Sequence, residues 1–141
     1  MKEEEKLRDV LAQIESYRGL SRLLQQQIAE LTAVRSEFSM TLNFLMEMEK
    51  MKEGDQILTP VGSGSFIKAK IDSTNVVLVS VGANVVVEKT PKEAREILES
   101  RIKEIDETLK TLRENLDKVD ERLRSLTPEA EKLMRESRRG T

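Results

Sequence analysis

The sequence contains no cysteine and no histidine, and aromatic residues make up only 3% of its 141 residues. Because cysteine is absent, a disulfide-stapled secreted fold and a catalytic thiolate are both excluded. Because histidine is absent as well, a Cys/His zinc site and a histidine general base cannot form. These absences remove several common classes of enzyme and metal site.

The sequence also lacks long hydrophobic runs and any excess of positive charge. No stretch of 18 apolar residues occurs, so no segment is expected to span a membrane. The charged start at 2–6 lacks the apolar core of a signal peptide, which favours a cytoplasmic protein. Lys and Arg number 24 against 26 Asp and Glu, whereas nucleic-acid binders usually carry a basic excess, so no nucleic-acid partner is expected.

The composition changes twice along the chain. Residues 54–91 carry six charged residues in 38 and hold eight of the valines, whereas both flanks are rich in the helix formers Leu, Glu, Lys, Arg and Gln. The pattern predicts an N-terminal helix region at 1–53, a β region at 54–91 and a C-terminal helix region at 92–141.

Both flanks repeat apolar residues every seven positions, which is typical of a coiled-coil seam. In the first flank one heptad position is apolar or aromatic throughout: Val10, Tyr17, Leu24, Leu31, Phe38 and Leu45. Ser21 and Arg35 interrupt its companion position. In the second flank the two positions are apolar throughout: Leu98, Ile105, Leu112, Val119, Leu126 and Leu133, with Ile102, Leu109, Leu116, Leu123 and Ala130.

The start of the second helix is marked by a helix-capping pattern. Thr90 is the expected N-cap, Pro91 occupies the first turn and Glu93 completes a capping box. Thr127 and Pro128 repeat this pattern inside the helix, so a kink or a restart is expected near 127–128.

The two helical stretches, 6–52 and 92–138, have the same length, about 70 Å of helix each. Equal lengths on either side of a compact insert favour an antiparallel hairpin, in which contacting residues have numbers that sum to about 143. The expected pairs are Leu45 with Leu98, Leu31 with Leu112, and Val10 with Leu133. The alternative is that each helix pairs with another chain.

The middle region predicts four strands, at 56–61, 65–71, 76–81 and 85–89, separated by turn residues. Residues 76–79 are apolar at every position, so this strand is expected to be covered on both faces. No helix of this chain is expected to cover it, and four short strands are barely stable alone.

We therefore expect strands from several chains to form one barrel or sandwich. The fold class is α+β: a long antiparallel coiled-coil helical hairpin with a four-stranded β insert, two hairpins, that joins an oligomeric β-barrel body. The residues expected to make this assembly are Ile57, Leu58, Phe66, Ile67, Val76, Val77, Leu78, Val79, Val81, Val85 and Val87.

No catalytic or cofactor-binding pattern is present. The segment 62–64 reads Gly-Ser-Gly, but a strand rather than a helix follows it, which favours a hairpin turn over a phosphate loop. Serines have no histidine to activate them. The acidic residues lie on helix faces among Lys and Arg, as solvated pairs do. The protein is therefore not expected to be an enzyme, and no cofactor and no metal are expected.

Several segments together resemble the alpha subunit of archaeal-type prefoldin. Residues 58–69, Leu-Thr-Pro-Val-Gly-Ser-Gly-Ser-Phe-Ile-Lys-Ala, are similar to the family's first hairpin. Residues 79–84 and 87–89 are similar to its second hairpin, and residues 126–130 to a segment that some members carry. Four strands favour the alpha type over the beta type.

The resemblance implies a hexamer of two alpha and four beta-type subunits, with a double β-barrel and six coiled coils around a cavity. It implies a chaperone that holds unfolded polypeptides without ATP and passes them to a group II chaperonin.

An antiparallel hairpin brings the two ends of the chain together at its tip. The residues expected there are Leu7, Val10, Leu11, Ile14, Leu126, Ala130, Leu133 and Met134. Leu11 and Met134 lie just beside the seam, so they are expected to be partly exposed. On the residues alone, this apolar surface either binds clients or simply closes the end of the coiled coil, and the resemblance favours client binding.

Two other functions remain open. One is a structural homo-oligomer or filament-forming coiled-coil protein of the same fold. The other is a coiled-coil adaptor that binds a folded partner without holding clients.

Overall fold

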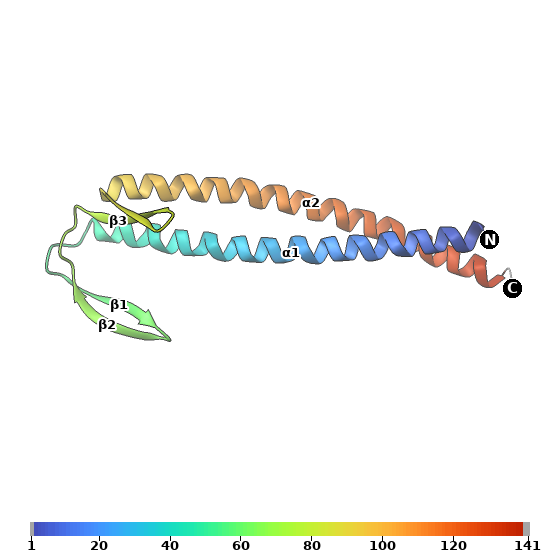
Figure 1. Ribbon diagram of the computed structural model, residues 1–141, viewed down its shortest axis with the longest axis horizontal. Coiled ribbons are helices and arrows are strands. Elements are labelled where there is room, and N and C mark those ends of the chain that lie inside the picture. Colours follow the sequence, from blue (N-terminus) through green and yellow to red (C-terminus); the bar gives the residue numbers. More distant parts are fainter. Residues whose placement is uncertain (1, 140–141) are drawn as a thin grey trace. The chain divides into compact units, whose positions relative to one another are not determined.

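The computed structural model describes residues 2–139 as two long helices that flank two β-hairpins (Figure 1). Helix α1 spans Lys2–Met48 and helix α2 spans Pro91–Arg139. Between them lie strands β1 (Gln56–Gly62), β2 (Ser65–Lys70), β3 (Val77–Gly82) and β4 (Val85–Lys89). The α+β fold with four strands is as expected.

The chain forms two compact units. The first, called the terminal unit, contains residues 2–34 of α1 and 105–139 of α2. The second, called the β unit, contains residues 35–104 with both hairpins. Each unit has its own buried apolar cluster, and in each the segments of α1 and α2 are antiparallel, as the heptads require.

The contacts between α1 and α2 follow the expected sum of about 143. Val10 and Leu133 share the cluster of the terminal unit, and Leu45 and Leu98 share the cluster of the β unit. Leu31 and Leu112 line one groove of the terminal unit. The chain thus pairs its own two helices, so the alternative of pairing each helix with another chain is not needed to bury these seams.

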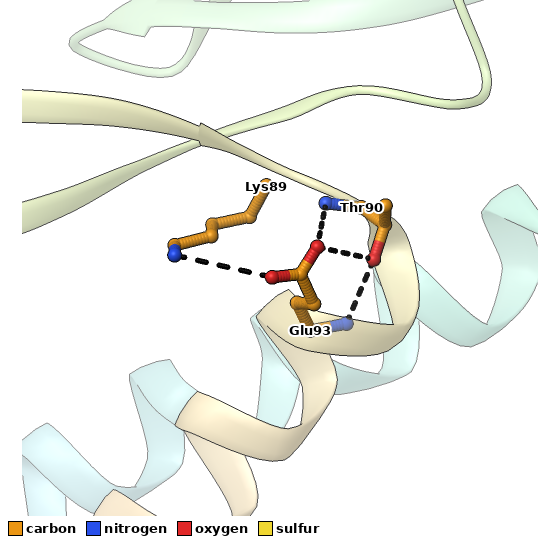
Figure 2. A network of polar contacts seen from close by, with 3 residues as sticks. All are labelled: Lys89, Thr90 and Glu93. Carbon is orange, nitrogen blue, oxygen red and sulfur yellow. Dashed lines mark hydrogen bonds and ion pairs between the residues drawn. The ribbon is translucent and has the colours of Figure 1, made fainter.

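Helix α2 begins at the predicted capping box (Figure 2). The Glu93 amide donates to Thr90 Oγ1 at 3.1 Å, and the Thr90 amide and hydroxyl donate to Glu93 Oε1 at 3.3 and 3.0 Å. These hydrogen bonds from Thr90, helped by the charge of Lys89, hold the pKa of Glu93 below its usual value. The Lys89 Nζ lies 3.9 Å from Glu93 Oε2. Strand β4 therefore passes into α2 without a flexible linker.

Helix α2 runs through Pro128 without interruption, so of the expected kink or restart near 127–128 the restart does not occur. Thr127 does not act as an N-cap there. Its hydroxyl donates back to the Leu123 carbonyl oxygen at 2.9 Å, a bond that threonine makes inside a continuous helix. The proline removes one backbone donor, but the surrounding packing of Leu126 and Ala130 keeps the helix in register. The kink stays a prediction.

The end of α1 comes at Met48, before the expected position 52. A tight turn follows, in which the Lys50 amide donates to the Glu47 carbonyl at 3.0 Å. Gly54 then adopts a φ of 87°, which a residue with a side chain rarely takes. The Arg95 guanidinium of α2 lies 2.8 Å from Oε1 of Glu49, the first residue after α1, so this ion pair joins α2 to the turn inside the β unit.

The four strands form two separate two-stranded antiparallel sheets, β1–β2 and β3–β4. Their bounds differ from the expected ones at the ends: Gly62 and Gly82 join the strands, and Ile71 and Val76 lie outside them. Both hairpins turn through two residues of positive φ, namely Ser63 and Gly64 in the first (50° and 74°) and Ala83 and Asn84 in the second (51° and 59°).

Each turn is preceded by a register shift, between Pro60 and Gly62 in β1 and between Ser80 and Gly82 in β3. Two positive φ values are the mark of a type I′ turn, whose twist matches that of the strands. The Gly-Ser-Gly segment is thus a hairpin turn, as the sequence indicated.

Candidate functional site

The residues expected at the tip gather into one apolar cluster of the terminal unit, called the terminal cluster. Its buried members are Val10, Ile14, Leu126, Ala130 and Leu133. Leu7, Tyr17 and Leu123 are partly buried against it. Leu126 is 1% exposed and is the largest fully buried side chain of the described residues. Residues near the two ends of the chain share this cluster because the helices run antiparallel with their apolar heptad faces in contact.

The eight residues expected to bind clients differ in how far they are exposed to solvent. Five of them form the buried part of the terminal cluster, so in this structure they offer no surface to a client. Leu11 and Met134 are 42% and 37% exposed, which confirms the expected exposure beside the seam. Leu7 is half-buried. The accessible part of the expected site is therefore Leu11 and Met134 with the edge of Leu7, supported from beneath by the buried five.

The surroundings of Met134 are charged. Met134 lines a shallow hollow of about 290 Å³ together with Glu131, Arg135 and Arg138. A flexible thioether framed by long charged side chains can meet apolar groups of different shapes, because methionine adapts its three side-chain torsions. This suits a surface that contacts many sequences weakly.

The sequence analysis missed a second set of exposed apolar side chains in the terminal unit. Leu20, Leu23 and Val34 of α1 are 41%, 50% and 40% exposed. Val34 lines a groove of about 390 Å³ with Leu31 of α1 and Leu112 of α2. The heptad pattern could have predicted two of these residues. Positions 20, 27 and 34 lie beside the seam and recur every seven residues, and two of the three are apolar.

The hairpins expose most of the residues expected to drive assembly. Seven of the eleven are exposed in the single chain: Leu58, Phe66, Ile67, Val76, Leu78, Val81 and Val85. The other four, Ile57, Val77, Val79 and Val87, are partly buried. Val86, 57% exposed, belongs to the same surface and was not singled out from the sequence. Large exposed apolar side chains at this density indicate a surface that another chain covers.

One expectation about the hairpins is wrong. Helices of this chain do cover part of strand β3, because Val77 and Val79 pack against the cluster of Leu45, Met48, Ala94 and Leu98. Arg101 of α2 also donates to the Ser80 carbonyl oxygen at 3.4 Å. Alternate residues of a strand point to opposite faces, so this packing leaves Leu78, 67% exposed, on the free face. Only one face of β3–β4 therefore needs a partner.

The described residues show no sign of a metal site or a membrane span. Within residues 2–139, no group of three or more acidic side chains converges in a way that could hold a metal ion. In the same range, no helix combines the length and the apolar character that crossing a bilayer requires. What the surfaces can do chemically is to bury apolar area against another polypeptide.

Comparison with known proteins places these features in a family. The family model described as prefoldin subunit matches residues 17–136. Prefoldin subunit alpha of Methanobrevibacter smithii is 32% identical over 133 residues, which are 94% of this chain and 90% of that protein. Prefoldin subunit alpha 1 of Thermococcus kodakarensis is 39% identical over 100 residues, 70% of this chain and 68% of that protein.

A solved structure agrees with the fold. The cryo-EM structure of filamentous PFD from Methanocaldococcus jannaschii matches with a TM-score of 0.64 and 28% identity, covering 89% of this chain and 98% of the other. The matched share of this chain is larger than its two helices, so the likeness concerns more than a coiled coil alone.

Proposed function

Because the chain belongs to the prefoldin family, we propose that it is the alpha-type subunit of an ATP-independent chaperone that holds unfolded polypeptides and delivers them to a group II chaperonin. The proposed holding surface consists of Leu11 and Met134, with Leu7 at its edge and the buried terminal cluster beneath it. The proposed setting is the cytoplasm, without a cofactor and without catalysis.

The observation that carries this proposal is the exposure of Leu11 and Met134 beside a well-packed cluster. A buried seam alone would close the end of the coiled coil and leave only charged side chains outside. Covering exposed apolar surface with a client contributes about 25 cal/mol per Å², so one such contact is weak. Several subunits must therefore hold one client together, and their effective concentration multiplies the affinity.

The proposed partners are beta-type prefoldin subunits, with two alpha and four beta chains in a complex. Support comes from the seven exposed apolar residues on the hairpins, which remain uncovered in a single chain. Two-stranded hairpins are marginal in water, so strands from several chains would stabilise one another in a shared barrel. Removing residues 56–89 and joining the helices by a short turn is expected to abolish this assembly.

The test is suppression of aggregation of an unrelated unfolded protein by the chain with a beta-type subunit. Replacing both Leu11 and Met134 by Ser is expected to weaken suppression several-fold, and removing residues 1–14 and 127–141 to abolish it. The matched control is Met46→Ser, because Met46 is 51% exposed but belongs to the β unit. Complex size is measured for every variant. A truncated complex that forms and still protects clients fully would place the holding surface elsewhere.

The second candidate is a homo-oligomeric or filamentous structural protein. It is favoured by one observation, the similarity to the chain in a filamentous assembly from Methanocaldococcus jannaschii. Light scattering on the isolated chain separates the two functions. Particles whose size grows without limit as the concentration rises support the filament, and a finite complex that forms only with a beta-type subunit supports the chaperone.

A further inference from the structure

The side of the coiled coil that carries the proposed holding surface also carries arginines to which the proposed function assigns no role. Leu11 and Met134 each directly follow a seam residue, Val10 and Leu133, and these two share the terminal cluster. Because both helices turn by about 100° per residue and run in opposite directions, the residues that follow such a pair lie on one side of the coiled coil. This side, called the Leu11 flank, continues one heptad further to Arg18.

Three glutamates lie on the Leu11 flank, at helix positions three, four or seven residues from its apolar pair, and two of them are already engaged. Glu15, four residues after Leu11, lies 4.0 Å from Arg22 Nη2. Glu4, seven residues before Leu11, interacts with another residue. The third, Glu131, lines the hollow described above. The flank therefore has one carboxylate whose charge is not compensated.

Arginines of the same flank are not compensated in this way. Arg8 lies three residues before Leu11 and Arg18 seven residues after it, while Arg135 lines the hollow beside Met134. All three arginines are exposed. Within residues 2–139 none of the three guanidinium groups pairs with a carboxylate. The exposed apolar pair thus lies in a positive field, although the whole chain has 26 acidic and 24 basic residues.

The spacing of these groups suits an unfolded chain that carries a carboxylate. Arginine holds carboxylates well, because its planar fork of N–H donors can form two parallel hydrogen bonds. Arg18 lies two helical turns from Leu11, roughly 10 Å along the axis. Unfolded chains often adopt the polyproline II conformation, in which the third residue along returns to the same side after about 9 Å. A client that places an apolar side chain on Leu11 therefore brings its third neighbour to Arg18.

We propose that the holding surface prefers segments of unfolded polypeptide in which a carboxylate lies about three residues from a large apolar side chain. The apolar side chain covers Leu11 and Met134, and the carboxylate pairs with Arg18 or Arg135. This inference rests on the proposed function, because it names the class of client that the same surface prefers. One exposed ion pair contributes up to about fivefold in a binding constant, and several subunits that hold one client multiply the effect.

The probes are three unfolded polypeptides of equal length with Leu and Phe at the same positions. Three residues from each apolar residue, the first carries Asp, the second Asn and the third Lys. Each competes with an aggregating client for the complex of this chain with a beta-type subunit. At low salt the Asp polypeptide is expected to compete roughly fivefold more strongly than the Asn polypeptide, and the Lys polypeptide least. The difference is expected to shrink at 1 M salt, where the screening length falls to about 3 Å.

Replacing both Arg18 and Arg135 by Gln is expected to weaken the preference for Asp over Asn, and replacing both by Glu is expected to shift it towards the Lys polypeptide. Because the beta-type chain is the same in every complex, a change in preference belongs to this chain. Circular dichroism and complex size show that each variant folds and assembles.

The matched control replaces Lys110 and Arg113 by Glu, which changes the net charge by the same amount at exposed positions of the terminal unit. Arg113 precedes Met134 by 21 residues, about 30 Å along α2, so this variant is expected to keep the wild-type preference.

Two results would overturn the proposal. One is a wild-type complex for which the three polypeptides compete equally at low salt. The other is a preference that stays unchanged when Arg18 and Arg135 are replaced by Glu. If replacing Leu11 and Met134 by Ser still weakens the holding of all three polypeptides, only the charge preference fails and the proposed holding surface stands. If that Ser variant holds all three as well as the wild type does, both proposals fail.

Discussion

Ser21 Oγ of α1 donates a hydrogen bond to Asp120 Oδ1 of α2 at 3.3 Å, joining two residues that lie 99 positions apart. Gln25 Nε2 donates in turn to Ser21 Oγ at 3.0 Å. Ser21 is only 7% exposed, in a seam that is mostly apolar. A buried polar residue in a coiled coil favours the one register in which its partner is within reach. The break in the heptad is thus a contact between the helices.

Replacing Ser21 by Ala is expected to destabilise the chain by about 1 kcal/mol, because Asp120 and Gln25 lose their common partner. Replacing both Ser21 and Asp120 by Ala is expected to cost less than the sum of the two single changes. Urea unfolding followed by circular dichroism measures the three variants. Strict additivity would show that the hydrogen bond contributes nothing to stability.

Leu126→Ala is expected to cost about 2–5 kcal/mol, because it opens a cavity in the terminal cluster that the surrounding residues fill only in part. The control is Leu23→Ala, at a half-exposed position of the same unit, for which a change within about 0.5 kcal/mol is expected. Thermal unfolding of both variants at equal concentration compares them. Equal losses in the two would mean that the terminal cluster does not stabilise the hairpin.

The start of α2 is expected to loosen in acid. Hydrogen bonds from Thr90 lower the pKa of Glu93 below its ordinary value of 4.5 in the folded chain. A lowered folded pKa means that the ionised form stabilises the fold above the unfolded pKa and that this contribution is lost as the pH falls through the folded pKa.

Glu93→Gln is therefore expected to weaken protection of the first-turn amides at pH 7 and to approach the wild type only as the pH falls below 4.5 and through the lowered pKa of the folded chain. Hydrogen exchange of the amides of residues 92–95 at several pH values is the measurement. A difference between variant and wild type that stays constant from pH 7 to pH 3 would contradict the role of the Glu93 charge.

Ala83 adopts a φ of 51°, a left-handed conformation in which its Cβ crowds the backbone. Ala83→Gly is expected to stabilise the β3–β4 hairpin by up to about 1 kcal/mol, because glycine takes this conformation without the steric cost. Ala69→Gly is the matched control. Ala69 lies in strand β2, where the same change is expected to destabilise by about 0.5–1 kcal/mol. Hydrogen-exchange protection of the two ladders should move in opposite directions.

Client holding is expected to be the same with ATP, without ATP and after enzymatic removal of ATP. The only glycine pair that resembled a phosphate loop, Gly62 and Gly64, forms the β1–β2 turn, and β2 rather than a helix follows it. Aggregation suppression and phosphate release are measured together on the complex. ATP hydrolysis that a substitution in residues 62–64 abolishes would refute this expectation.

The two helices and their pairing could be read from local patterns. A seven-residue period fixes which face of each helix is apolar. Equal lengths favour the antiparallel register, and the structure shows it in the clusters where Val10 meets Leu133 and Leu45 meets Leu98. The capping box at Thr90 and the turn at 62–64 were also predictable, because their chemistry involves residues within a few positions of one another.

Contacts between distant segments were not predictable in the same way. An all-apolar strand at 76–79 requires cover, but its sequence does not say which chain supplies it. The structure places Val77 and Val79 against this chain's own helices and leaves Leu78 free.

A heptad pattern likewise does not predict how much of an apolar cluster stays exposed to solvent. Five of the eight residues expected to bind clients are buried in the structure. The sequence determined the elements, their faces and their register, because these depend on periodicity and neighbouring side chains. Only the tertiary structure decided which faces are covered, because burial depends on how side chains far apart in the chain pack together.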